Sequence, residues 1–321
     1  MRWIAKAATQ KMLSWLPGSE DINYFLQRRI AKNIPRSDRD FFHWTNIAIQ
    51  HLDLLARFGP EENLSEAAFF EFGAGWDLLV PLAYYALGVN HQTLVDISRH
   101  IRFDLINDTV CRLGKNRREL EQRTGRSWRE VKQTTVTKVA DLHDFFGITY
   151  LAPVDARQTG LPAEEFGFIS NTATLEHIPP PDLAAILPEC WRILKPGGIL
   201  SCRIDMADHY SYFDSSISAY NFLRFSERQW RLICSSLAYT NRLRRPDYLR
   251  LARDAGFEIA QEDMDNPTDG DMEVLRHLPL SQEFREGYSL EDLGVKRLRL
   301  VLRKPRLEAT GAGYVTGAGV R

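Results

Sequence analysis

The chain has 321 residues, of which 44% are hydrophobic and 26% are charged, a composition typical of a folded globular protein. Its formal net charge of −1 argues against a nucleic-acid partner, because nucleic acids are bound by strongly basic surfaces. The four cysteines are widely spaced without a Cys-x-x-Cys pair, so we expect reduced thiols in a cytoplasmic protein, no disulfide framework and no metal site.

Residues 1–65 predict a helical N-terminal extension. Apolar residues recur there at helical spacing, and Pro17, Pro35 and Pro60 interrupt the pattern. The stretch before Pro17 is basic and mildly amphipathic, and it lacks the apolar core and cleavage site of a signal peptide. No run of about 18 apolar residues predicts a membrane span. We expect the first helix to pack on the protein, with contact to a membrane surface as the alternative.

An apolar run that ends in an acid and two alternate glycines organises the next part of the chain. It reads Ala67-Ala68-Phe69-Phe70-Glu71-Phe72-Gly73-Ala74-Gly75-Trp76-Asp77, and an amphipathic segment follows from Leu78 to Leu87. The pattern predicts a buried strand, a tight turn and a helix. Glycines in such a turn let the backbone approach a ligand and let the helix pack on its strand.

Strands and helices then alternate along the chain. The apolar runs predict strands at residues 91–96, 148–156, 166–171, 199–204 and 295–303, with another beginning at 257. Helical patterns cover residues 97–113, 181–194 and 246–255, and Lys195-Pro196-Gly197-Gly198 predicts the turn after the second of them.

Two insertions and a tail depart from this alternation. Residues 114–147 are polar, and we predict a solvated helical insertion there, with a phosphate-binding patch as the alternative. Residues 205–245 are rich in aromatic side chains, which suit both the core of a helical subdomain and the lining of an acceptor pocket. The Gly- and Ala-rich residues 306–321 predict a disordered tail.

Alternating strands and helices predict a parallel sheet with helices on both faces. Ligands of such sheets bind beyond the carboxyl ends of the strands. Polar residues fall at four successive strand ends in this sequence, and they are Glu71, Asp96, Asp155 and Asn171. We therefore expect the binding site at this edge of the sheet.

In these motifs the chain resembles the class I S-adenosylmethionine-dependent methyltransferases. The resemblance covers about residues 65–260 and rests on the order and spacing of Glu71-Phe72-Gly73-Ala74-Gly75, Asp96, Asp155-Ala156, Asn171 to Pro179 and Leu194-Lys195-Pro196-Gly197-Gly198. It implies a Rossmann-like, seven-stranded, mostly parallel sheet within a methyltransferase domain at residues 66–305. It also implies S-adenosylmethionine as the cofactor and S-adenosylhomocysteine as its product.

The resemblance implies roles for individual residues. Gly73 and Gly75 would let the backbone approach the cofactor, and Glu71 would contact its amino-acid end. Asp96 would accept hydrogen bonds from the ribose hydroxyls, and Asp155 with Ala156 would face the adenine. The cofactor-binding residues that we expect are Glu71, Gly73, Ala74, Gly75, Asp96, Ile97, Asp155, Ala156 and Asn171.

The turn departs from the family pattern at Asp77, where a third glycine is frequent. Asp77 either caps the following helix or faces the cationic end of the cofactor. The same departure argues against a nicotinamide dinucleotide, because Asp77 would repel a phosphate and Leu78 stands where that motif needs glycine.

The catalytic residues that we expect follow the fourth and fifth strands. Methyl transfer to oxygen gains from a general base. His209 is the first choice for this base, with Asp205 or Asp208 as its orienting partner, and His177 is either structural or functional. Further along the chain, Arg242, Arg244 and Arg245 form either a solvated cluster or a clamp for an anionic substrate. All of these positions surround the expected acceptor side.

A looser resemblance concerns the acceptor. Residues 208–214, 220–223 and 241–244 are similar to methyltransferases of bacterial polysaccharide or secondary-metabolite pathways. We therefore expect biosynthetic O-methylation of a small molecule or saccharide. The alternatives are an inactive binding or regulatory protein with this fold, and a methyltransferase that acts on a lipid-linked or protein acceptor.

Overall fold

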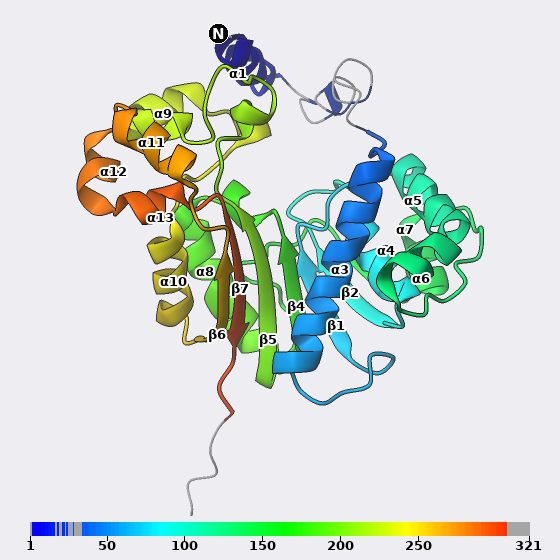
Figure 1. The fold of residues 1–321 in the computed structure, drawn as a ribbon. Coiled ribbons are helices and arrows are strands. Elements are labelled where there is room, and N and C mark those ends of the chain that lie inside the picture. The colour runs from blue at the N-terminus through cyan, green and yellow to red at the C-terminus, as the bar shows by residue number, and fades with distance from the viewer. Residues whose placement is uncertain are drawn as a thin grey trace, which may run out of the picture.

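The computed structural model describes residues 2–16, 18, 21–22, 24, 28 and 34–306, and its centre is one seven-stranded sheet between two layers of helices (Figure 1). The strand order is β3-β2-β1-β4-β5-β7-β6, and β7 alone runs antiparallel to its neighbours. The strands are β1 (Ala68–Phe72), β2 (His91–Val95), β3 (Ile148–Leu151), β4 (Phe166–Thr172), β5 (Leu194–Asp205), β6 (Glu258–Met264) and β7 (Arg297–Arg303). The predicted Rossmann-like, seven-stranded and mostly parallel sheet is confirmed.

Helices cover both faces of this sheet, as predicted (Figure 1). One face is covered mainly by α3 (Asp38–Phe58), α4 (Leu79–Ala86), α5 (Phe103–Lys115), α6 (Arg117–Thr124) and α7 (Val139–Phe146). The other face is covered by α8 (Pro180–Ile193) and α10 (Arg245–Asp254). The remaining α-helices of the described residues are α1 (Arg2–Leu13), α9 (Glu227–Ile233), α11 (Asp269–His277), α12 (Gln282–Gly287) and α13 (Leu290–Gly294).

The central strands explain why two helical layers are needed. Consecutive strand residues point to opposite faces, so Phe69 and Phe168 pack under α3 and α4, while Phe70 and Ile169 pack under α8. All seven residues of β4 are buried, which fits a strand covered on both faces. This burial keeps the carboxyl ends of the strands at one fixed edge.

A separate helical subdomain stands above the carboxyl ends of β5 and β6 and the amino end of β7 (Figure 1). Its core joins aromatic residues of the predicted insertion 205–245 to residues of α11, α12 and α13 and to Trp3 of α1. Trp3 is 6% exposed, lies 5.8 Å from the Tyr210 ring and donates its backbone N–H to Asp214. The prediction that the first helix packs on the protein is therefore confirmed.

Helix α3 places part of the predicted N-terminal extension on the sheet itself. Ser37 caps this helix by accepting the N–H of Asp40, and the buried side chains of Phe41, Ala48 and Leu52 belong to the core beneath it. The domain division after residue 65 stays a prediction, because α3 packs within the same core as β1 and α4. The predicted tail after residue 306 lies outside the described residues.

Three predictions of local structure were wrong. The fifth strand begins at Leu194, where we predicted Ile199, although Lys195–Gly198 pair with no residue of β4: the register passes from Phe166 opposite Leu194 to Phe168 opposite Ile199, and Gly197 has a left-handed φ of +81°. Residues 125–138 form no regular helix and are not fully solvated, since Trp128 is buried in the core. The helices α11, α12 and α13 lie in the connection from β6 to β7, where we predicted no element.

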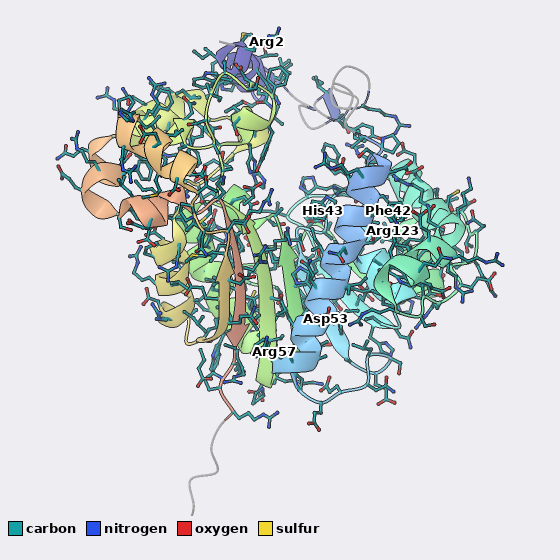
Figure 2. The ribbon with its side chains drawn as sticks, viewed as in Figure 1. Arg2, Phe42, His43, Asp53, Arg57 and Arg123 are labelled. Carbon is teal, nitrogen blue, oxygen red and sulfur yellow. The ribbon has the colours of Figure 1, made fainter. Side chains whose placement is uncertain are left out.

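The polar insertion nevertheless keeps its charges paired. Arg117 and Arg123 form ion pairs with glutamates one turn away, and Arg126 pairs with Asp53 of α3. The guanidinium of Arg123 also lies over the ring of Phe42, 4.1 Å from its centroid (Figure 2). These contacts attach α6 to α3 and leave the phosphate-binding alternative without support.

No helix of the described residues is both long and apolar enough to cross a lipid bilayer.

Candidate active site

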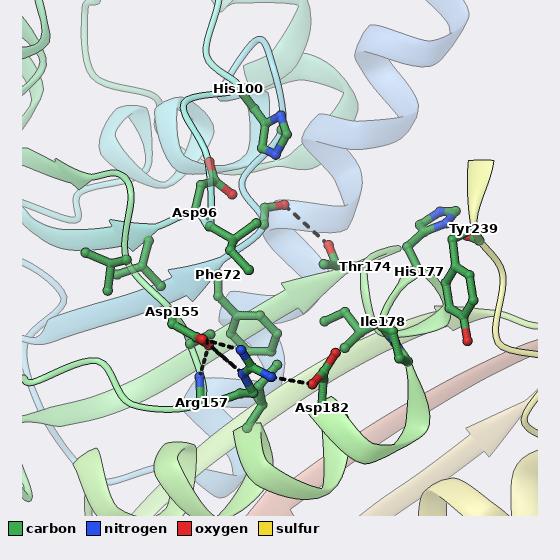
Figure 3. A pocket seen from close by; sticks show the side chains of 18 of the residues that line it. Phe72, Asp96, His100, Asp155, Arg157, Thr174, His177, Ile178, Asp182 and Tyr239 are labelled. Carbon is green, nitrogen blue, oxygen red and sulfur yellow. Dashed lines mark hydrogen bonds and ion pairs between the residues drawn. The ribbon is translucent and has the colours of Figure 1, made fainter. Parts of the chain in front are cut away.

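A cavity of about 550 Å³ opens at the carboxyl ends of the parallel strands (Figure 3). Each of the four strands β1 to β4 is followed by residues that line it, and a loop of the helical subdomain closes one side. The lining includes Gly73 and Gly75 after β1, Asp96 and Ile97 after β2, Asp155 and Ala156 after β3, Thr174 and His177 after β4, and Ser236 to Tyr239 from the subdomain. The volume suits a ligand of nucleoside size or larger.

The two glycines of the turn serve different purposes. Both have a left-handed backbone, with φ of +73° at Gly73 and +79° at Gly75. A Cβ on Gly73 would lie 2.4 Å from Cγ2 of Thr174, so this glycine is needed for packing. A Cβ on Gly75 would meet no described atom within 4 Å, so this glycine leaves space at the cavity wall. Open backbone beside a cavity is what a closely bound ligand requires.

Glu71 lies behind this turn, in a smaller cavity of about 140 Å³ that Ala74 also lines. Its carboxylate accepts a hydrogen bond from Ser170 Oγ at 3.1 Å, and burial raises the pKa of Glu71 to about 8. Gly73 and Gly75 line both cavities, so the turn is the wall between them. Glu71 therefore reaches the main cavity only through or around the turn.

Asp77 replaces the third glycine and is buried at the start of α4. It accepts the N–H of Leu79 at 3.3 Å, and its Oδ2 lies 2.5 Å from Nε of Arg36. The first of the two predicted roles, at the N-terminus of the helix, is supported by this contact. The ion pair with Arg36 already balances the charge of Asp77, which leaves the second role without support.

Asp96 and Ile97 offer one polar and one apolar group to the cavity. Asp96 is buried and accepts a hydrogen bond from Tyr150 Oη at 2.8 Å, while burial raises its pKa to about 6. At neutral pH the carboxylate is ionised and can accept further hydrogen bonds. The side chain of Ile97 is 67% exposed at the cavity, where a flat ring can pack against it.

Asp155 is held at the opposite wall by a neighbour that the sequence analysis did not single out. Arg157 donates to both oxygens of Asp155, at 2.6 to 3.0 Å, and also donates to Asp182 of α8 at 2.6 Å (Figure 3). The guanidinium holds the pKa of Asp155 below its usual value. Asp155 therefore stays ionised and fixed beside Ala156.

Asn171 lies beneath the site and does not line either cavity. It is completely buried in β4, and its amide nitrogen donates to the carbonyl of Phe72 at 3.2 Å. This bond joins the end of β4 to the start of the glycine turn. The positions that line the cavity are instead the next residues, Ala173 and Thr174.

The three expected catalytic residues are brought together near the subdomain. The rings of His177 and His209 are 4.9 Å apart, and Nε2 of His209 lies 3.8 Å from Oδ2 of Asp205. His177 lines the cavity, whereas His209 and Asp205 lie behind it. Burial lowers the pKa of both imidazoles, that of His209 to about 4, so both are neutral at pH 7.

Some lining residues carried no signal in the sequence. Arg157 and Thr174 line the cavity, and Tyr150 supports it only through its hydrogen bond to Asp96. Spacing along the chain does not reveal these contacts. The aromatic insertion was expected at the acceptor side, and its loop 236–239 does line the cavity. Which four residues of that insertion would do so depends on how the subdomain packs.

The arginines at the end of the insertion form neither a solvated cluster nor an anion clamp. Arg244 is completely buried and donates to the carbonyls of Met206, Leu293 and Val295. Arg242 is also buried and donates to carbonyls of the subdomain. Arg245 forms ion pairs with Glu262 and Asp292. Both predicted alternatives are therefore wrong, because these guanidinium groups already have partners within the protein.

A protein-family model described as a methyltransferase domain matches residues 43–262 of this chain. No curated protein sequence matches it. The chain is similar to the solved structure of an S-adenosylmethionine-dependent methyltransferase from Methanosarcina mazei, at 16% identity over 79% of this chain and 97% of that chain, with a TM-score of 0.41. It is also similar to geranyl diphosphate C-methyltransferase from Streptomyces coelicolor, at 15% identity over 86% and 88%, with a TM-score of 0.45. The family match extends from α3 into β6 and contains every strand end at the cavity.

Proposed function

This chain belongs to the methyltransferase domain family and is an S-adenosylmethionine-dependent methyltransferase, and we propose that it methylates a hydroxyl oxygen of a small molecule or saccharide unit. The observation that carries the proposal is the cavity at the strand ends inside the matched region. Its neutral imidazole and the aromatic and apolar loop 236–239 support a small, partly apolar acceptor with an ionisable hydroxyl.

We assign the cofactor to the part of the cavity between the glycine turn and Asp155. Asp96 would accept the ribose hydroxyls, and Asp155 with the Ala156 N–H would bind the adenine beside Ile97. Gly73 to Gly75 would line the methionine end of the cofactor, and Glu71 would contact that end through the turn. Asn171 would contribute by holding that turn. The open space at Gly75 and the ionised carboxylate of Asp96 support this fit.

When bound, S-adenosylmethionine supplies a methyl carbon on a positively charged sulfur, and the sulfur keeps the electron pair of the broken C–S bond. The protein then has two tasks. It must hold the acceptor oxygen in line with that carbon, and it must receive the hydroxyl proton as the new C–O bond forms.

The pair of imidazoles is suited to the second task. Nδ1 of His177 lies 2.7 Å from the carbonyl oxygen of Tyr239, and a carbonyl only accepts, so Nδ1 carries the proton. The lone pair of His177 therefore lies on Nε2. We propose that the proton is accepted by this histidine pair, with His209 beside His177 and Asp205 as the nearest carboxylate.

Calorimetry with S-adenosylhomocysteine tests the cofactor assignment. We expect saturable binding of one molecule per chain. Absence of binding by folded protein would contradict the proposal, and a labelled-methyl screen against hydroxylated small molecules and saccharides then tests the acceptor. Methylation confined to nitrogen, carbon or protein acceptors would overturn the O-methylation proposal.

Substitution of His209 tests the proton-accepting pair. His209 does not line the cavity, so we expect His209→Ala to keep S-adenosylhomocysteine affinity within about twofold, while turnover falls roughly 10²- to 10⁴-fold. The matched control is His91→Ala, an exposed histidine at the opposite end of β2. Unchanged turnover in His209→Ala would remove this residue from the mechanism.

A further inference from the structure

Three side chains that can ligate a metal ion converge beside the cavity. Each of Glu176, His177 and His209 offers one ligand atom, and these atoms all lie within 4.8 Å of one another. Glu176 and His177 come from the short 3-10 helix after β4 (Leu175–His177), and His209 comes from another after β5 (His209–Tyr212). Both segments follow neighbouring strands of the sheet, so the backbone fixes their approach.

Glu176 contributes a buried carboxylate in which only one of the two oxygens has a hydrogen-bond partner among the described residues. The residue is 2% exposed, and its Oε1 accepts the backbone N–H of Asp205 at 3.2 Å. Its Oε2 is buried and has no hydrogen-bond partner among the described residues. Buried carboxylate oxygens are normally hydrogen-bonded or bound to a cation, because their desolvation is otherwise uncompensated.

The two imidazoles are in the state that metal binding requires. The Tyr239 carbonyl fixes the proton of His177 on Nδ1, so Nε2 presents a lone pair. Such a bond from the far ring nitrogen to a carbonyl is a common support for ligating histidines. Nε2 of His209 is buried and has no hydrogen-bond partner in the described part of the chain.

We propose that Glu176, His177 and His209 form a site for one divalent transition-metal cation. Two imidazole nitrogens and one carboxylate oxygen are the donor set preferred by Zn²⁺ and Fe²⁺, with further positions left for water or substrate. Asp205 adds a second carboxylate 3.8 Å from His209, and Lys6 is the nearby positive charge that works against the site. The prediction of no metal site rested on the spacing of the cysteines and is revised by this proposal.

The place of the cluster gives the cation a role, and this step rests on the proposed function. His177 lines the cavity, so a cation on its Nε2 could also bind the acceptor oxygen. A bound cation lowers the pKa of a coordinated hydroxyl, whose proton would pass to water. The two histidines would then act as ligands, and the cation, in place of the histidines, would favour the ionised form of the acceptor oxygen.

Calorimetric titration of Zn²⁺ into the full chain, previously treated with a chelator, tests the site. We expect one cation per chain. Glu176→Gln keeps an acceptor for the Asp205 N–H and removes the charge, and His209→Gln removes an imidazole. Each should weaken Zn²⁺ binding at least about a hundredfold, since even the loss of a supporting residue costs 10- to 100-fold. The control His143→Gln removes an exposed imidazole of α7 and should bind like the unmodified chain.

Two further measurements keep the outcome clear. Both variants should retain S-adenosylhomocysteine affinity, because neither residue lines the cavity. If a variant loses this affinity, X-ray absorption of the Zn²⁺-loaded unmodified chain provides the test instead, and it should show scattering from two imidazoles. No Zn²⁺ binding, equal binding by the variants, or absent imidazole scattering would overturn the metal site. Loss of S-adenosylhomocysteine binding alone would instead contradict the proposed function.

Discussion

Asp96 combines burial with a position at the cavity, and its charge state should control cofactor affinity. Replacing its carboxylate by Ala removes charged hydrogen bonds, each of which contributes roughly 1.5–3 kcal/mol, so Asp96→Ala should weaken S-adenosylhomocysteine roughly 10- to 100-fold. Because the pKa of Asp96 is about 6, affinity of the unmodified chain should also fall as the pH is lowered from 7 to 5. Calorimetry at several pH values measures both effects.

The control for this prediction is Asp254→Ala, which removes an exposed carboxylate at the end of α10. Its affinity and pH profile should match the unmodified chain, and Asp96→Ala should lose the pH dependence. Equal affinities of Asp96→Ala and the unmodified chain would refute the ribose assignment.

Glu71 should destabilise the folded chain as the pH rises. Burial raises its pKa to about 8, so the folded state holds a proton that the unfolded state releases near pH 4.3. The stability contribution of Glu71 therefore falls between about pH 4.3 and pH 8. Glu71→Gln lacks this titration, and its free energy of unfolding relative to the unmodified chain should rise by roughly 2–4 kcal/mol from pH 5 to pH 9.

Urea unfolding at a series of pH values measures this difference, with the exposed Glu61→Gln as the control. A difference that does not change with pH would mean that Glu71 is ionised in the folded state throughout, in which case Arg36 across the small cavity would be the first residue to examine.

At the scale of elements, the glycine turn offers a test that separates backbone strain from ligand space. Gly75→Ala and Gly125→Ala both force alanine into a left-handed backbone with no described atom within 4 Å of the new Cβ. Each should lose about 1–2 kcal/mol of stability. Only Gly75→Ala should also weaken S-adenosylhomocysteine, by at least about tenfold, because its Cβ enters the cavity.

Thermal unfolding and calorimetry on the two variants provide the comparison. If Gly125→Ala and Gly75→Ala bind S-adenosylhomocysteine equally well, the open space at Gly75 is not occupied by the cofactor.

The elements that the sequence predicted well are those governed by local patterns. Phe69 and Phe70 place apolar side chains on the two faces of β1, and an acid or amide follows at or near the end of each central strand, so the parallel sheet and its binding edge followed directly. The start of β5 was misplaced because Leu194 already pairs with Phe166, ahead of the irregular segment at Pro196 and Gly197 where the register shifts. Such pairing is invisible in one segment alone.

The residues of the candidate site were predictable from the sequence to a similar extent as the elements of the fold. Asp96, which directly follows β2, and Asp155, which lies in the turn after β3, do line the cavity. Asn171 also stands near a strand end, but its side chain lies beneath the glycine turn, where it donates to the carbonyl of Phe72. Thr174 is the residue that lies beside Gly73. The direction of a side chain at a strand end depends on the last turn of backbone, and the sequence pattern does not specify that turn.

At the scale of the whole molecule, α1 attaches the first residues of the chain to the subdomain over the cavity. Trp3 is buried against Tyr210 and Phe225. We therefore expect Trp3→Ala to lower the free energy of unfolding by about 3 kcal/mol. This value is at the low end for a buried tryptophan, because a terminal helix can detach. Urea unfolding measures the loss. Ile4→Ala, at a neighbouring exposed position, should change it by less than about 0.5 kcal/mol.

Hydrogen exchange should then show faster exchange in the subdomain of Trp3→Ala than in the strands of the sheet. Equal stability of Trp3→Ala and Ile4→Ala would mean that α1 contributes nothing to the folded state in solution.

The buried guanidinium of Arg244 has a consequence for anyone who wishes to exchange acceptor specificity between related enzymes. It binds the carbonyl of Met206, directly after β5, and those of Leu293 and Val295, directly before β7. The insertion after β5 and the connection from β6 to β7 are thus coupled into one module, although α10 and β6 lie between them in the chain. A chimera that transplants the insertion after β5 alone would leave the carbonyls of Leu293 and Val295 buried without partners, or would leave the guanidinium of Arg244 with one of its three carbonyls. Grafts should move both segments together, with α1 as the third piece.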